Sequence, residues 1–184
     1  NIPGTIPDNK GVTFTVTEIG NAADFNCKKI TSVIIPSTIT RIVIGAFNQA
    51  ALETITIPAT INDIQENAFI YMRQVPKFQV HNSNAKYESD ANGVLYERGK
   101  KRLCFVPSRI AADTHSDTYT VDPQVTYISL GAFTQNSGLK KIVLPKNLEK
   151  VGESYPSIVN TDVFEEFVMT QENDKFKVVD GVLF

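Results

Sequence analysis

Apolar residues recur along this chain in a pattern that repeats every 22 positions. Pro36 and Pro58 are each followed by isoleucine after three and six residues, and then by an Ala-Phe pair. Phe25, Phe47 and Phe69 are likewise spaced by 22 positions. A unit of this length cannot bury its own apolar residues, so we expect the copies to stack into a solenoid with one continuous core. The repeated phenylalanines are predicted to form the spine of that core.

An L-x-x-L-x-L pattern lies between the phenylalanine of one unit and the end of the next strand. Its last two apolar residues are separated by one outward position, which is the period of a strand with one buried face. Where proline follows, it ends the strand, because proline has no N–H to donate to a neighbouring strand. The pattern therefore predicts four short strands. The apolar positions are Ile30, Val33 and Ile35; Leu52, Ile55 and Ile57; Val75, Phe78 and Val80; and Leu139, Ile142 and Leu144.

The repeat predicts one solenoid domain over residues 1–184, made mostly of short β-strands with short helical turns and inserted β-hairpins. The hairpin insertions are expected at about residues 81–122 and 170–184. The repeat coils are expected at about residues 12–35, 36–57, 58–80, 123–144 and 145–169.

The two insertions resemble each other in sequence. Asn84 of the first corresponds to Asn173 of the second, and "NGVLY" corresponds to "DGVLF" at the chain end. Asn-Gly and Asp-Gly are preferred in tight turns. In the first insertion, residues 93–96 and 102–106 are predicted to form hairpin strands joined by "ERGKK", and the following "SRIAADTHSDT" is predicted to be an exposed connection.

Composition and charge narrow the functional classes. A net charge of −2 provides no field to attract nucleic acid, and the apolar runs are far shorter than the roughly 20 residues that span a bilayer. The chain begins at Asn1 without an initiator methionine, so we expect a longer precursor that continues past Phe184. Cys27 and Cys104 belong to different predicted coils and are expected to remain unpaired thiols.

The segment "LETITIPATINDIQENAF" (residues 52–69) resembles the repeat of the BspA-like leucine-rich repeat surface proteins. The insertions are similar to interruptions found in Bacteroides members of that family. The resemblance implies a right-handed leucine-rich repeat superhelix, removal of a signal peptide, and an extracellular or bacterial cell-surface location with a role in adhesion. It implies no catalytic residues. Val43 and Gln65 depart from the usual glycine, and residues 155–164 depart from the Ala-Phe turn.

The sequence contains no pattern that predicts catalysis, a metal site or a cofactor. His81 and His115 are the two histidines, and neither has cysteine or carboxylate partners at ligand spacing. The segment "DANG" (residues 90–93) begins like a calcium loop but lacks the later acidic ligand, so a turn is the better interpretation. The basic run of residues 98–102 could bind an anionic partner, although a solvated hairpin tip is more typical of such a run. We therefore predict a protein that is not an enzyme.

The outward positions of the predicted strands form the candidate partner-binding face, because repeat proteins bind partners on such extended surfaces. These positions are Ser32, Ile34, Thr54, Thr56, Lys77, Gln79, Lys141 and Val143.

Two classes of function remain open. The first is a module that binds a host or bacterial surface protein whose identity the sequence does not reveal. The second is a glycan-binding module or a spacer within a larger surface protein; glycan binding would require a row of exposed aromatic residues. The exposure of the six tyrosines distinguishes these classes.

Overall fold

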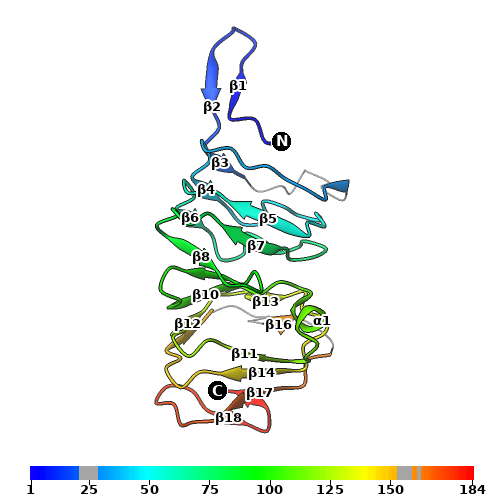
Figure 1. Ribbon diagram of the computed structural model, residues 1–184, viewed down its shortest axis with the longest axis vertical. Helices are drawn as coiled ribbons and strands as arrows, with labels where there is room; N and C mark the ends of the chain where they lie inside the picture. Colours follow the sequence, from blue (N-terminus) through cyan, green and yellow to red (C-terminus); the bar gives the residue numbers. More distant parts are fainter. Residues whose placement is uncertain (21–28, 153–158, 161–162) are drawn as a thin grey trace.

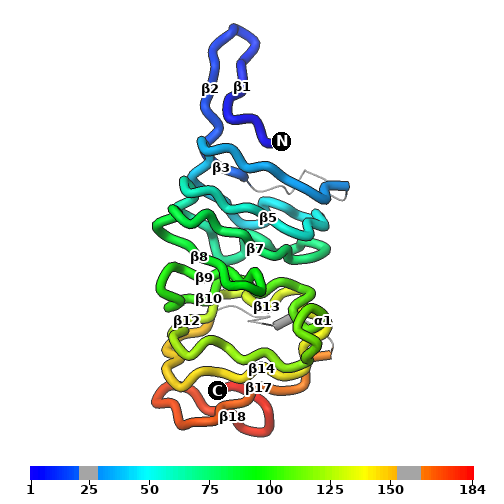
Figure 2. Tube along the Cα trace, viewed as in Figure 1, coloured from blue at the N-terminus to red at the C-terminus, as the bar shows by residue number. Residues whose placement is uncertain are grey.

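The computed structural model describes residues 1–20, 29–152 and 163–184, together with the backbone of residues 159–160. The chain winds as stacked coils along one long axis, with a hairpin near the N-terminus at one end and the C-terminal hairpin near the other (Figures 1 and 2). The described residues contain many short strands and one short helix, α1 (Ile110–Thr114). The predicted repeat solenoid of mostly short β-strands is confirmed.

The first row of strands comes from the L-x-x-L-x-L pattern. β5 pairs with β7 in parallel, while β14 pairs in parallel with both β11 and β17. Side chains along β5 alternate between exposed and buried, as the period of two requires. We call the outward side of this row the strand face. Its strands are β5 (Thr54–Ile57), β7 (Lys77–Val80), β11 (Thr118–Thr120), β14 (Lys141–Leu144) and β17 (Glu166–Met169).

A second row of two-residue strands forms where the apolar residues three apart return to the core. Arg41 in this row lies in register between Glu18 and Asp63, and its guanidinium pairs with both carboxylates at 3.1 and 2.6 Å. Stacking thus places opposite charges in neighbouring coils. The row comprises β3 (Glu18–Ile19), β4 (Arg41–Ile42), β6 (Asp63–Ile64), β12 (Tyr127–Ile128) and β15 (Lys150–Val151), and β13 (Phe133–Thr134) pairs separately with β16 (Val159–Asn160).

The repeated phenylalanines pack against each other inside the stack. Phe47 is 4% exposed and Phe69 is fully buried, with their rings stacked 5.7 Å apart. Phe69 also makes an edge-to-face contact with Phe105 at 5.1 Å. The predicted core spine is confirmed for these two repeat positions, whereas Phe25 lies outside the described residues.

Hairpins occur at both ends of the stack and in its middle. β1 (Thr5–Pro7) pairs with β2 (Thr13–Thr15), and β18 (Val178–Val179) pairs with β19 (Val182–Leu183). In the first insertion, β9 (Leu95–Glu97) pairs antiparallel with both β8 (Tyr87–Ser89) and β10 (Arg102–Phe105). The predicted hairpin of β9 and β10 is confirmed, and the structure adds β8 as a third strand.

The first insertion is a layer within the stack rather than an appendage. Leu95 packs into the core of the preceding coils, whereas Val94 and Tyr96 pack into the core of the following coils. β10 continues this layer, because it pairs in parallel with β12 of the next coil. The insertion therefore forms part of the core on both of its sides.

The prediction that "SRIAADTHSDT" is an exposed connection was wrong. This segment contains α1, and the side chain of Ile110 is only 1% exposed. Thr118, which follows it directly, begins β11, which pairs in register with β14. The polar composition of the segment concealed one buried isoleucine that anchors the helix to the core.

Candidate interaction surface

β5 and β7 bring four of the eight predicted face residues together. Thr54 lies opposite Lys77, and Thr56 lies opposite Gln79. Three of these side chains are exposed and that of Lys77 is half-buried. The parallel pairing of two strands with the same inward-outward alternation produces this four-residue patch.

The other predicted face residues lie apart from this patch. Lys141 and Val143 are on β14, in a separate sheet, where neighbouring strands on both sides leave them half-buried. Ser32 and Ile34 lie in an extended segment outside any strand, and Ile34 is 65% exposed. The fold therefore divides the candidate face into three parts.

The two predicted lysines are both paired with carboxylates. Lys77 Nζ lies 3.0 Å from Asp113 Oδ2 on α1, and Lys141 pairs with Glu166, its register partner on β17. The hydrogen bond from Lys141 to Glu166 raises the pKa of the ammonium. Sequence reasoning missed both partners, because they lie one coil or more away along the chain.

An open groove lies beside the patch, between the starts of β5 and β7 and the helix α1. Its volume is about 310 Å³. We call it the α1 groove, and its lining residues are Glu53, Thr54, Gln74, Val75, Lys77, Pro107, Arg109 and Asp113. The groove contains two predicted face residues, Thr54 and Lys77. The only sequence signal for its helical wall is the apolar pair Ile110–Ala111 within a polar segment.

The basic run at residues 98–102 is largely engaged in contacts within the protein. Arg98 donates to the carbonyl oxygens of Asn84 and Tyr87, and Lys100 lies 2.7 Å from Asp122. Arg102 pairs with Glu66 at 2.9 Å and with Glu97 at 3.2 Å. These contacts favour the interpretation of this run as a structural turn.

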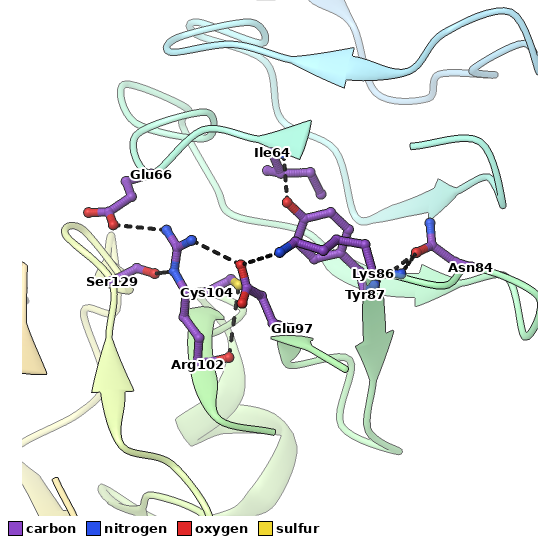
Figure 3. A network of polar contacts seen from close by, with 9 residues as sticks. All are labelled: Ile64, Glu66, Asn84, Lys86, Tyr87, Glu97, Arg102, Cys104 and Ser129. Atoms are coloured by element: carbon purple, nitrogen blue, oxygen red, sulfur yellow. Dashed lines mark hydrogen bonds and ion pairs between the residues drawn. The ribbon is translucent and has the colours of Figure 1, made fainter. Parts of the chain in front are cut away.

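Arg102 is the centre of a polar network that joins the insertion to the coils on both sides (Figure 3). Its Nε donates to Ser129 Oγ at 2.7 Å, in the coil that follows the insertion. Glu66, in the coil that precedes the insertion, accepts hydrogen bonds from Arg102 and from the Tyr127 hydroxyl. This network explains why the basic run has little freedom to bind a partner.

Two buried titratable groups lie near this network. The Ile64 N–H donates to the Tyr87 hydroxyl at 2.7 Å, and burial raises the pKa of Tyr87 to about 12. Burial also raises the pKa of the Cys104 thiol to about 12, so this free thiol has little nucleophilic thiolate at neutral pH. Cys27 lies outside the described residues, and the absence of a bond between the two cysteines stays a prediction.

The remaining candidates for chemistry are exposed or occupied. His81 and His115 are exposed, and Asp90 Oδ1 accepts hydrogen bonds from the N–H groups of Asn92 and Val94, as in a turn. Across residues 1–20, 29–152 and 163–184, no group of three or more His, Cys, Asp or Glu side chains could hold a metal ion. None of the helices in this part of the chain is long and apolar enough to cross a membrane.

The tyrosines form no exposed row within the described residues. Tyr71 is 60% exposed, whereas Tyr87 and Tyr96 are buried. Tyr119 and Tyr127 are half-buried, and Tyr155 lies outside the described residues.

Comparisons with known proteins place this architecture among bacterial surface repeats. A family described as BspA type leucine rich repeat region matches residues 9–92 and 103–177 in six copies. Similar solved structures include a leucine-rich repeat protein from Eubacterium ventriosum, which is 21% identical with a TM-score of 0.60 over 72% of this chain and 34% of that chain.

A leucine rich cell surface protein from Faecalibacterium prausnitzii is 22% identical, with a TM-score of 0.63 over 83% of this chain and 38% of that chain. The pneumococcal vaccine antigen PcpA is 19% identical, with a TM-score of 0.50 over 90% of this chain and 61% of that chain. The chain thus spans less than two thirds of each of these proteins, and likenesses at such identities show the fold alone. No curated protein sequence matches significantly.

Proposed function

The chain belongs to the BspA-type leucine-rich repeat family, and on that premise we propose that it is a non-catalytic, exported cell-surface module that binds a protein partner in adhesion. Structurally similar proteins include a cell surface protein and a vaccine antigen, which supports the location. The family's repeats carry no catalytic residues onto this chain. A Bacteroides source stays a prediction.

The β5–β7 patch is the observation that carries the proposed binding role. Thr54, Thr56 and Gln79 are exposed on two strands whose backbones are fixed by parallel pairing and by a buried inner face. A preformed surface binds at little ordering cost, since few groups lose conformational freedom. The α1 groove adds a concave feature next to this patch.

Glycan binding is the weaker alternative. Sugar-binding sites generally stack rings on exposed aromatic side chains, and Tyr71 stands alone as an exposed tyrosine in the described part of the chain. A spacer role would leave the patch without a partner. Both alternatives are outcomes of the experiment that follows.

Site-specific photo-crosslinking tests the proposal. A benzophenone amino acid replaces Thr56 or Gln79, and the protein is exposed to host matrix proteins and to surface proteins of neighbouring bacteria. We expect one protein to be labelled from both positions and to be competed away by excess unlabelled wild-type protein. The matched control position is Asn62, which is exposed outside the strand face.

Equal labelling from position 62 would remove the strand face as the site, and no competed labelling at all would favour the spacer role. Thr56 and Gln79 are better probe positions than the two lysines. Reversing the charge of Lys77 or Lys141 would place a carboxylate against Asp113 or Glu166, which would disturb the fold as well as the surface.

A further inference from the structure

The α1 groove is held open by contacts within the chain. The hydroxyl of Ser108 accepts a hydrogen bond from the Val75 N–H at 2.7 Å, and the Ser108 N–H donates to the Val75 carbonyl at 3.1 Å. The Lys77–Asp113 ion pair connects the strand side of the groove to its helical wall. On the strand side, Gln74 Nε2 donates to the Leu52 carbonyl at 3.2 Å. The walls are therefore fixed before any partner arrives.

The charges around the groove divide into a paired set and an unpaired set. Lys77 and Asp113 neutralise each other. Glu53 and Arg109 are both exposed, and neither side chain takes part in an ion pair within the described residues. The groove thus presents one free anion, from the start of β5, and one free cation, from the start of α1.

The lining argues against an apolar small-molecule ligand. Only Val75 and Pro107 are apolar among the lining residues, whereas small-molecule sites are mostly apolar and enclosed. An extended peptide is better matched, because its residues i and i+2 project on the same side about 7 Å apart. Two such side chains of opposite charge could meet the two unpaired charges together.

We propose that the α1 groove receives an extended segment of the partner that carries a basic and an acidic side chain on one side, the basic one meeting Glu53 and the acidic one meeting Arg109. This inference rests on the proposed function and names the chemistry of the partner at the same face. Electrostatic complementarity of this kind contributes specificity more than affinity, since both charges remain near water.

Peptide titrations followed by NMR test the inference directly. The ¹⁵N-labelled protein is titrated with an acetylated, amidated Gly-Lys-Thr-Glu-Gly peptide. The control peptides replace Lys-Thr-Glu with Glu-Thr-Glu, Lys-Thr-Lys or Gln-Thr-Gln. We expect the mixed-charge peptide to bind most tightly and to shift the amide signals of Thr54, Val75 and Arg109.

Substitutions then assign the two charges. Glu53→Gln and Arg109→Gln should each weaken binding of the mixed-charge peptide by about threefold, as for exposed ion pairs. Glu149→Gln and Lys101→Gln, which change exposed charges outside the groove, should leave it unchanged. The double variant Glu53→Arg with Arg109→Glu should reverse the preference, so that Glu-Thr-Lys binds better than Lys-Thr-Glu.

Equal binding of all four peptides, or unchanged affinity in both groove variants, would overturn the inference. If peptide binding fails while photo-crosslinking from positions 56 and 79 succeeds, the proposed function stands and the groove is excluded. If crosslinking shows no preference for those positions over position 62, the proposed use of the strand face fails as well.

Discussion

The two insertions carry the same sequence motif and anchor themselves in the same way. Asn84 Nδ2 donates to the carbonyls of Pro58 and Ile61 at 2.8 and 2.9 Å, and Asn173 Nδ2 donates to those of Lys146 and Leu148 at 2.6 and 2.9 Å. Each asparagine Oδ1 also accepts two backbone N–H groups. The amide thus closes the turn of the preceding coil in both copies.

The glycine of the motif also has one function in both copies. The Gly93 carbonyl accepts from the Phe78 N–H on β7 at 3.0 Å, and the Gly181 carbonyl accepts from the Phe167 N–H on β17 at 2.8 Å. Both glycines have positive φ, 78° and 79°. Each insertion is therefore joined to the last strand-face strand before it.

The copies differ in the burial of the residues after the glycine. Val94, Leu95 and Tyr96 are at most 2% exposed, whereas Val182 is 53% and Phe184 is 70% exposed. In the first copy β10 pairs with β9, and the next coil packs on the far side. The difference teaches that the motif determines how an insertion is anchored, while neighbouring strands determine whether it becomes core.

The largest difference between the copies is expected at Tyr96 and Phe184. Tyr96→Ala should lower the free energy of unfolding by about 3–5 kcal/mol, because it removes a buried aromatic ring and a partner of the Tyr119 hydroxyl. Phe184→Ala should change it by less than about 0.5 kcal/mol. Urea unfolding followed by circular dichroism measures both values. Equal costs would mean that the exposed ring is covered in solution.

A smaller difference is expected at the two glycines. A Cβ at Gly93 would lie 2.8 Å from Lys77 Cβ and 3.0 Å from Lys77 Cα, in a backbone conformation that disfavours side chains. Gly93→Ala should therefore cost about 2–3 kcal/mol. Gly181→Ala should cost about 1–2 kcal/mol, since its backbone clash is milder, at 3.4 Å from Glu166 Cα. Thermal unfolding should rank the two variants in this order.

The asparagines should show the same ranking with smaller values. Asn84 is 1% exposed, so Asn84→Ala leaves buried backbone groups without partners and should cost about 2 kcal/mol. Asn173 is only half-buried, and water can replace its side chain, so Asn173→Ala should cost about 1 kcal/mol. Equal losses in chemical denaturation would contradict the claim that burial separates the copies.

The smallest effect is expected when Tyr87 is replaced by the phenylalanine that the second copy carries at Phe176. Tyr87→Phe should cost about 1 kcal/mol at about pH 8, because the Ile64 N–H loses its acceptor. The folded pKa of Tyr87 is raised to about 12, so the wild type loses stability as pH rises from the unfolded pKa of about 10 towards that value. Phenylalanine does not ionise, so the deficit should shrink at about pH 11. A deficit that grows with pH would contradict this account.

Much of the fold follows from local pattern. The 22-residue period places Phe47 over Phe69, and the alternation in "TITI" places Thr54 and Thr56 outward, because both depend only on spacing along the chain. The similarity of the two insertions was also readable, since the same asparagine and glycine perform the same local tasks. Part of the candidate face was therefore predictable as a set of outward positions.

The partners of those positions were not predictable. Asp113 reaches Lys77 from a helix that its polar sequence conceals, and the α1 groove exists because Ser108 attaches that segment to Val75. The engagement of Arg102 by Glu66 and Ser129 depends on three segments of the chain meeting at the insertion. No spacing rule links these residues.

The sequence by itself determined the repeat, the direction of each strand's side chains and the anchoring of each insertion. These features depend on residue spacing, on proline's missing donor and on the hydrogen-bonding groups of a few side chains. The tertiary structure alone decided that the first insertion is a core layer, that the candidate lysines are paired and that a charged groove lies beside the β5–β7 patch. Burial and pairing depend on which distant segments stack together, and that is a property of the assembled solenoid.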